Sequence, residues 1–309
     1  MKTLLIGNAI VDVVLNVQTL PKTGDDIYCQ KQTINIGGCA YNVATILSHF
    51  GLEHDLVVPI GEGSYASMIK QELLNHHYKL HIEERGQDNG YCLCLVEDHG
   101  ERTFITVPGI EADYRQEWLS TLQGKDYDHI YISGYEMEGK SGKIISEWLQ
   151  TQQIQSLYFA PGPRITFIEK EIMDDLISLH PILHLNETEA LKFSGQSELL
   201  SAAKIIYERT QNELFITLGE NGVLYYNGDA HFIPSVKTPV INTIGAGDSH
   251  LGGLIAMRSL GYDTLKSCEI ANRIAAKVVS LESSKFEKEY FNKGDFIDVN
   301  TRDENEKLL

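Results

Sequence analysis

The chain has 309 residues, of which 42% are hydrophobic and 22% charged, and this composition is ordinary for a globular protein with one large core. Acidic residues outnumber basic residues by 43 to 26, and the formal charge of −17 argues against nucleic acid or a membrane surface as a partner. Five scattered cysteines, no secretory signal pattern and no long apolar run predict a cytoplasmic protein with reduced thiols.

The N-terminal part of the chain is rich in predicted strands. Hydrophobic periodicity predicts strands at 3–7, 13–17, 28–34, 56–61, 90–97 and 103–107, and helices at 40–50 and 67–76. His99 and Gly100 are typical of a hairpin turn between the last two strands. Within the segments at about 13–35 and 90–107, strand follows strand without a helix between them. We therefore expect these segments to form a small accessory sheet inserted into a larger body.

The rest of the chain alternates between strands and helices. The pattern predicts strands at 129–132, 156–159, 182–185 and 214–217, and helices at 142–152, 165–179, 187–193, 198–211, 246–260 and 264–281. Such alternation predicts an α/β fold with a mostly parallel sheet covered by helices on both faces. We expect residues 1–299 to form a single domain and the charged residues 300–309 to be a frayed tail.

A glycine-rich turn opens the helix predicted at 246–260. Residues 242–250 read Asn-Thr-Ile-Gly-Ala-Gly-Asp-Ser-His. Gly245, Ala246 and Gly247 are small, so an anion could approach the unpaired N–H groups and the positive dipole end of the helix. Asp248 follows directly and could take a proton from an attacking hydroxyl group. The alternative is that Asp248 is a simple N-cap of this helix.

Four motifs in this chain, in the same order and at similar spacings, resemble those of the ribokinase-like (PfkB) carbohydrate kinases. They lie at 37–44, 186–189, 216–223 and 242–248, and the resemblance extends over about residues 4–285. Residues 90–104 and 133–136 resemble most a bacterial branch of uncharacterised sugar kinases. The resemblance implies a three-layer α/β fold with a β-sheet lid, and ATP and Mg²⁺ as cofactors. It also implies transfer of the γ-phosphate of ATP to a hydroxymethyl group of a sugar.

The resemblance assigns Asp248 as the general base and the turn Gly245–Gly247 as the anion hole. It also implies a set of residues that bind the sugar acceptor, namely Asp12, Gly37, Gly38, Asn42 and Glu136. Asp12 follows the first strand, where open α/β sheets bind ligands, and its carboxylate could accept two hydrogen bonds from a diol. The alternatives are an Asx-turn for Asp12 and a surface ion pair for Glu136.

The nucleotide and the metal ion have their own implied residues. For the nucleotide these are Asn186, Thr217, Gly219, Gly222 and Asn272. Asn186 and Glu189 could hold magnesium through water, because this ion keeps much of its hydration shell. The alternatives are a helix capping box formed by Asn186 and Glu189, and a solvated position for Asn272.

The chain departs from the family pattern around the implied cation site. Asn242 replaces the usual acidic residue, and residues 282–286 replace a glycine-rich loop, which makes activation by a monovalent cation doubtful. Residues 160–164 also differ at their first position, although Arg164 could reach a substrate or phosphate oxygen.

Two other functions stay open, namely a nucleoside kinase of the adenosine or pseudouridine type and a non-catalytic regulator that binds sugar or nucleotide. Tyr28, Tyr41 and Tyr91 could stack on a base, cover a sugar or belong to a core. A dehydrogenase would need a Gly-x-Gly-x-x-Gly turn after the first strand, which this chain does not have. We also expect a homodimer that forms through the lid.

Overall fold

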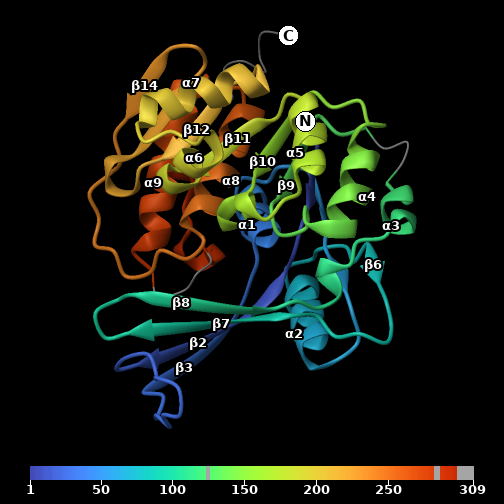
Figure 1. Cartoon of the computed structure of the whole chain (residues 1–309), viewed down its shortest axis with the longest axis vertical. Coiled ribbons are helices and arrows are strands. Elements are labelled where there is room, and N and C mark those ends of the chain that lie inside the picture. The colour runs from blue at the N-terminus through green and yellow to red at the C-terminus, as the bar shows by residue number, and fades with distance from the viewer. Residues whose placement is uncertain (123–125, 282–285, 298–309) are drawn as a thin grey trace.

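The computed structural model describes residues 1–122, 126–281 and 286–297, and its body is an eight-stranded sheet between helices (Figure 1). The strand order is β14-β13-β12-β11-β10-β9-β1-β4. The strands from β4 to β12 in this order run parallel, and β13 and β14 are antiparallel. The strands are β1 (Thr3–Ile6), β4 (His54–Val57), β9 (His129–Ser133), β10 (Ser156–Ala160), β11 (Ile182–Asn186), β12 (Leu214–Thr217), β13 (Val223–Tyr226) and β14 (Ala230–Ile233).

Helices cover both faces of this sheet because successive side chains of its buried strands point to opposite faces. Leu5 of β1 packs toward one helix layer, while Leu4 and Ile6 pack toward the other. The layer on the side of Leu5 contains α1 (Cys39–His49), α8 (Ala246–Ser259) and α9 (Thr264–Val279). The opposite layer contains α3 (Gln116–Ser120), α4 (Gly139–Leu149), α5 (Lys170–Ser178), α6 (Glu187–Ser194) and α7 (Leu199–Thr210).

A second sheet projects from the body as a lid (Figure 1). Its strand order is β3-β2-β7-β8, from β2 (Ile10–Val17), β3 (Lys31–Gly37), β7 (Tyr91–Glu97) and β8 (Arg102–Val107). Helix α2 (Ser64–Asn75) packs against β2 and β3. The remaining short elements are β5 (Pro59–Ile60), β6 (Ile82–Glu83), η1 (Ile110–Ala112), η2 (Gly162–Thr166), η3 (Gly219–Asn221), η4 (Lys288–Tyr290) and η5 (Lys293–Asp295).

The register of the lid gives its two faces different chemistry. Asp12 pairs with Asn35 and Cys92, and Cys92 pairs with Thr106, so these polar side chains share one face. The residues one position along the strands form an apolar row on the other face, namely Val13, Ile34, Leu93 and Ile105.

The base of the lid is held by one buried carboxylate. Glu111, which is 5% exposed, accepts hydrogen bonds from the backbone amides of Gly90 at 2.9 Å and Gly109 at 2.8 Å. Asn89 Nδ2 also donates to Glu111, at 3.2 Å. Gly90 precedes β7 and Gly109 follows β8, so Glu111 fixes both ends of this hairpin where it leaves the body.

Most predicted elements are confirmed, and the differences are local. The strand predicted at 28–34 begins only at Lys31, and Tyr28 is 97% exposed. The helix predicted at 165–179 is wrong at its start, because η2 precedes α5. Strands β13 and β14 were not predicted. The expectations for residues 282–285 and for the tail at 300–309 lie outside the described residues. No helix in the described part of the chain is long and apolar enough to cross a membrane.

Candidate active site

Two backbone amides at the start of α8 form the candidate anion hole. Gly245 caps the helix with a φ of 77°, a left-handed conformation that glycine adopts without strain. The amides of Ala246 and Ser249 bond to preceding carbonyls at 3.3 and 2.9 Å. Those of Gly247 and Asp248 have no backbone partner among the described residues. A Cβ on Gly247 would meet nothing within 4 Å, so the space next to these amides is open to an anion.

Asp248 lies within the first turn of α8 and does not cap it, so the capping alternative is wrong. Its Oδ2 accepts a hydrogen bond of 2.8 Å from Asn42 Nδ2, and it also accepts one from the Cys39 thiol. Both donors come from the first turn of α1. Burial raises the pKa of Asp248 to about 6, although these two hydrogen bonds act in the opposite direction. The carboxylate therefore becomes a usable base near neutral pH.

Asp12 faces the same space from the lid. It accepts no hydrogen bond from any described residue, so the alternative of an Asx-turn is wrong, and it crowds Gly37, where a Cβ would overlap its Oδ2. Burial and the charge of Asp248 raise the pKa of Asp12 to about 7. Asp12 thus lies within electrostatic range of Asp248, and it still has its full capacity to accept hydrogen bonds from a ligand.

Glu136 is 2% exposed and belongs to a buried network, so the surface ion pair is wrong. Its Oε1 accepts a hydrogen bond of 2.8 Å from Asn8 Nδ2, and its Oε2 accepts a hydrogen bond from Ser133 Oγ. Asn8 Oδ1 in turn accepts from the amide of Cys39 at 3.2 Å and so caps α1 in place of Gly38. A Cβ on Gly38 would lie 2.6 Å from that same oxygen. Burial raises the pKa of Glu136 to about 7.

Asn186 and Glu189 form the complete capping box that we considered as an alternative to a metal site. Asn186 Oδ1 accepts from the amide of Glu189 at 2.8 Å, and Glu189 Oε2 accepts from the amide of Asn186 at 2.9 Å. Burial, and to a smaller extent Asp248, raise the pKa of Glu189. The oxygens of Glu189 already accept hydrogen bonds and are therefore less available to bind a metal ion directly. This pair fits magnesium held through water. Among the described residues, no group of three or more His, Cys, Asp or Glu side chains is arranged so that it could hold a metal ion directly.

The predicted nucleotide residues lie at the carboxyl end of β12 and beside it. Thr217 ends β12, and the turn after it contains Gly219 and Gly222, with φ of 58° and 98°. A Cβ on Gly222 would overlap the carbonyl oxygen of Ile233. Asn272 is 4% exposed, so the solvated alternative is wrong. Its Nδ2 donates to the carbonyls of Ile233, the last residue of β14, at 3.1 Å and of Pro234 at 3.0 Å, and thus fixes the start of the segment that leads to the anion hole.

Arg102 is a candidate site residue that the sequence did not single out. It lies at the tip of the lid, and its Nη1 donates to Thr243 Oγ1 in the turn before α8. Its Nε is buried without a hydrogen-bond partner among the described residues. The register could have indicated it, because Arg102 shares the face of Thr106 and Cys92. Asn8, Cys39 and Ser133 were also missed, because only the folded chain brings them together.

Arg164 does not reach toward a substrate as expected. It forms a bidentate ion pair with Glu138, with Nη2 and Oε2 2.8 Å apart, and its guanidinium lies 4.1 Å from the centre of the Phe167 ring. Asn242 uses its side-chain oxygen to accept 3.0 Å from the amide of Ile244. The expected absence of cation activation stays a prediction, because most of the loop that would complete the site lies outside the described residues.

The three tyrosines considered for base stacking do not line the site. Tyr28 lies outside the lid strands. Tyr41 is buried against Tyr78, and Tyr91 stacks on Tyr65 with ring centres 4.8 Å apart. Tyr91 also belongs to the lid face opposite Asp12.

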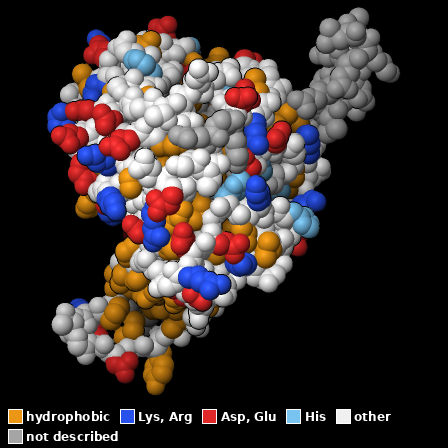
Figure 2. All heavy atoms as spheres, turned by 90° about the vertical axis from the view of Figure 1, so that its right-hand side faces the viewer, with side chains coloured by type: hydrophobic (Ala, Val, Ile, Leu, Met, Phe, Trp, Pro, Cys, Tyr) orange, Lys and Arg blue, Asp and Glu red, His pale blue; other side chains and the backbone are white. Residues whose placement is uncertain are grey.

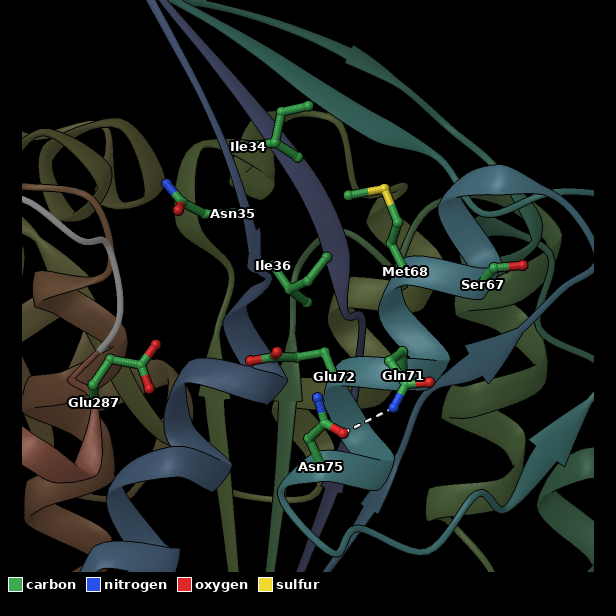
Figure 3. Close-up of a pocket in the computed structure, with 9 residues that line it drawn as sticks. All are labelled: Ile34, Asn35, Ile36, Ser67, Met68, Gln71, Glu72, Asn75 and Glu287. Carbon is green, nitrogen blue, oxygen red and sulfur yellow. Dashed lines mark hydrogen bonds between the residues drawn. The ribbon is translucent and has the colours of Figure 1, made fainter.

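A groove lies away from this chemistry, between β3 and α2 (Figure 3). It has a volume of about 540 Å³, and its apolar wall includes Ile34, Ile36 and Met68. Because it contains none of the predicted site residues, we assign it no catalytic role.

Comparisons with known proteins show the family of this chain and its fold. The model of the pfkB family carbohydrate kinases matches residues 2–289. An uncharacterized sugar kinase of Escherichia coli K12, YegV, is 34% identical over 281 residues, which cover 89% of this chain and 88% of that protein. The fold resembles Arabidopsis thaliana ribokinase complexed with ribose and ATP, with a TM-score of 0.75, 16% identity, and coverage of 93% of this chain and 96% of that one.

A nucleoside kinase of Burkholderia thailandensis in complex with inosine has a TM-score of 0.74 and 18% identity, and the alignment covers 92% of this chain and 93% of that one. These likenesses confirm the predicted fold class. The family match over nearly the whole sequence shows that this chain belongs to the pfkB family of carbohydrate kinases, enzymes that transfer a phosphoryl group to an alcohol of a sugar.

Proposed function

We propose that this enzyme transfers the γ-phosphate of ATP to a hydroxymethyl group of a sugar. The observation that carries the proposal is the arrangement of Asp248 and Asp12. Asp248 lies beside two unpaired helix amides, and the coupled, partnerless carboxylate of Asp12 faces it from the lid. The amides suit a moving phosphoryl group, and the carboxylates suit the hydroxyls of an acceptor.

In this mechanism Asp12 accepts hydrogen bonds from two acceptor hydroxyls, and Asp248 accepts the proton of the attacking hydroxyl. The amides of Gly247 and Asp248 stabilise the charge of the phosphoryl oxygens. Asn186 and Glu189 would hold hydrated Mg²⁺, which neutralises phosphate charge when bound. The network from Glu136 through Asn8 keeps α1 in position, and α1 supplies the donors that hold Asp248.

The lid would keep water out of the reaction. Arg102 bonds to the turn before the anion hole, so the lid tip and the phosphate side of the site are in contact in this structure. Closing the site over a sugar limits wasteful hydrolysis of ATP.

A nucleoside kinase is the second candidate, and one observation favours it. Phe104 pairs with Cys94 and lies on the same lid face as Asp12, where it is 53% exposed. An exposed ring on this face could stack on a base. A non-catalytic regulator is disfavoured, because pure binding has no need of the carboxylate of Asp248.

Asp248→Asn tests the proposal directly, because it keeps the shape of the side chain and removes the base. We expect phosphoryl transfer to fall by at least about 10²-fold with little change in ATP affinity. Asp263→Asn is the matched control, because Asp263 caps α9 by accepting 2.9 Å from the amide of Lys266, and asparagine can do the same. Normal turnover by the Asp248 variant would refute the assignment.

We also propose that the enzyme is a homodimer formed through the apolar face of the lid. Ile34 and Ile105 are 48% and 51% exposed on that face, and hydrophobic side chains gather over the lid end of the molecule (Figure 2). The face continues into the apolar wall of the groove beside α2 (Figure 3). Two such faces would cover each other around a two-fold axis.

A further inference from the structure

The charges around the acceptor space are strongly one-sided. Asp248 accepts a hydrogen bond from Asn42 in the first turn of α1, and Glu136 is linked through Asn8 to the amide of Cys39 at the start of the same helix. Asp12 also acts electrostatically on the Cys39 thiol, so three carboxyl groups lie around the start of α1. The Tyr135 side chain is close to Cys39 and to Asp248 as well. The side chains around the acceptor space are therefore carboxyls, thiols, a phenol and the amide of Asn42.

Two arginines lie near this space, and both are engaged elsewhere. Arg164 lies beside Tyr135, but Glu138 binds its guanidinium through two hydrogen bonds. A bidentate pair of this kind fixes the geometry of the guanidinium and cancels its charge. Arg102 bonds to Thr243 and so serves the phosphate side of the site.

The segments that carry Tyr135 and Arg164 pack tightly against each other, which keeps this ion pair in place. A Cβ on Gly134 would overlap the carbonyl of Pro161. The segments follow β9 and β10, which are neighbours in the sheet. Glu138 and Arg164 thus come from adjacent strand ends at the border of the acceptor space.

An anionic acceptor would lose its hydration here and meet carboxyl groups, while the two nearby arginines of the described residues are already bonded to Glu138 and Thr243. Like charges brought together in a binding site weaken binding, and specificity often depends on such repulsion. A neutral polyol meets no such repulsion, and an acceptor with an ammonium group is attracted by the carboxyl groups.

We propose that this kinase selects its acceptor by charge, taking uncharged or amine-bearing polyhydroxylated molecules and rejecting sugar phosphates and sugar acids. The proposal rests on the proposed function, because it assumes that the acceptor lies between Asp12 and Asp248. Glu138 acts as a specificity-determining residue by neutralising Arg164.

The test compares two pools of acceptors with the unaltered enzyme, ATP and Mg²⁺. One pool contains pentoses, hexoses, hexosamines and nucleosides, and the other contains hexose phosphates with one free hydroxymethyl group and aldonic acids. We expect release of ADP with the first pool and at least about 10²-fold less with the second. Equal turnover, or turnover of the anionic pool alone, would overturn the proposal. If neither pool reacts, the proposed kinase function fails instead.

Glu138→Gln tests the role of the ion pair, because it keeps the size of the side chain and frees the charge of Arg164. We expect the ratio of kcat/KM for an anionic acceptor to that for its neutral counterpart to rise about tenfold or more. The double variant Glu138→Gln/Arg164→Gln should lose this gain. Glu208→Gln is the control, because it removes the partner of Lys204 in an exposed pair on α7. An unchanged ratio in Glu138→Gln would show that Arg164 does not face the acceptor.

Discussion

The hydrogen bond from Asn42 to Asp248 predicts how the activity of this enzyme depends on pH. Asn42 Nδ2 donates 2.8 Å to a buried carboxylate whose pKa is already raised to about 6. A donor to the charged form of an acid lowers its pKa, so removal of this donor must raise it. We therefore expect Asn42→Ala to make Asp248 a weaker base at acidic and neutral pH.

The size of the change follows from the type of bond. A buried hydrogen bond to a charged group contributes about 1.5–3 kcal/mol, and 1.36 kcal/mol corresponds to one pKa unit. Loss of the bond should move the pKa of Asp248 from about 6 into the range of roughly 7 to 8. Because the parent carboxylate is itself about half protonated at pH 6, the variant should be impaired about five- to fiftyfold more at pH 6 than at pH 9.

The assay is the acidic limb of kcat/KM against pH, which reports the pKa of the essential base in the free enzyme. Thr45→Ala is the control, because Thr45 lies on the same helix and its hydroxyl donates to the carbonyl of Tyr41 at 3.0 Å. It should leave the limb unchanged. A variant at Asn42 with lower activity at every pH and an unmoved limb would refute the reasoning and leave Asn42 a role in acceptor binding only.

Three further predictions concern the rest of the fold. Burial lowers the pKa of His250 to about 4 and also holds the pKa of His184 below its usual value, and ring nitrogens of the two residues lie 2.9 Å apart. The unfolded chain therefore binds more protons than the folded chain as the pH falls from about 6.5 to 4. We therefore expect the stability of His250→Gln, measured by chemical denaturation, to fall by up to about 3 kcal/mol less over this pH range than the stability of the parent protein. An equal dependence of stability on pH in the two proteins would contradict this prediction. Arg102→Ala should reduce kcat about tenfold or more and increase ATP hydrolysis without acceptor, whereas an unchanged ratio of hydrolysis to transfer would exclude a role in closure. Light scattering at micromolar concentration should give a dimer for the parent and a monomer for Ile105→Lys, and a monomeric parent would refute the lid dimer.

The alternation of strands and helices predicted most of the body because each parallel strand is buried on both faces and forms a continuous apolar run. The same pattern did not predict the edge hairpin β13–β14, although Asn227 and Gly228 between the strands are typical hairpin residues, with a φ of 107° at Gly228. The capping box of Asn186 and Glu189 was recognisable because it depends only on residues three apart.

The roles of single carboxylates were harder to predict because they depend on distant partners. Glu136 and Asn8 are 128 positions apart, and Asn42 and Asp248 are 206 apart, so no local pattern could indicate these bonds. Asp248 was open to a capping role because the helix could have begun at either side of the glycine-rich turn. The left-handed conformation of Gly245 places the start of α8 before Asp248, and this leaves the carboxylate free to face the site.

Register in the lid decides both what the enzyme binds and what covers its outer face. The side chains of a strand alternate between faces, so Asp12 and Val13 belong to opposite surfaces although they are neighbours in the chain. A shift of one residue would turn Asp12 away from Asp248 and bring an apolar row to the acceptor. Glu111 opposes such a shift at the ends of β7 and β8, because its carboxylate is bonded to the amides of both Gly90 and Gly109. The buried carboxylate of Glu111 therefore protects the identity of both faces, and with it the position of the acceptor beside the base.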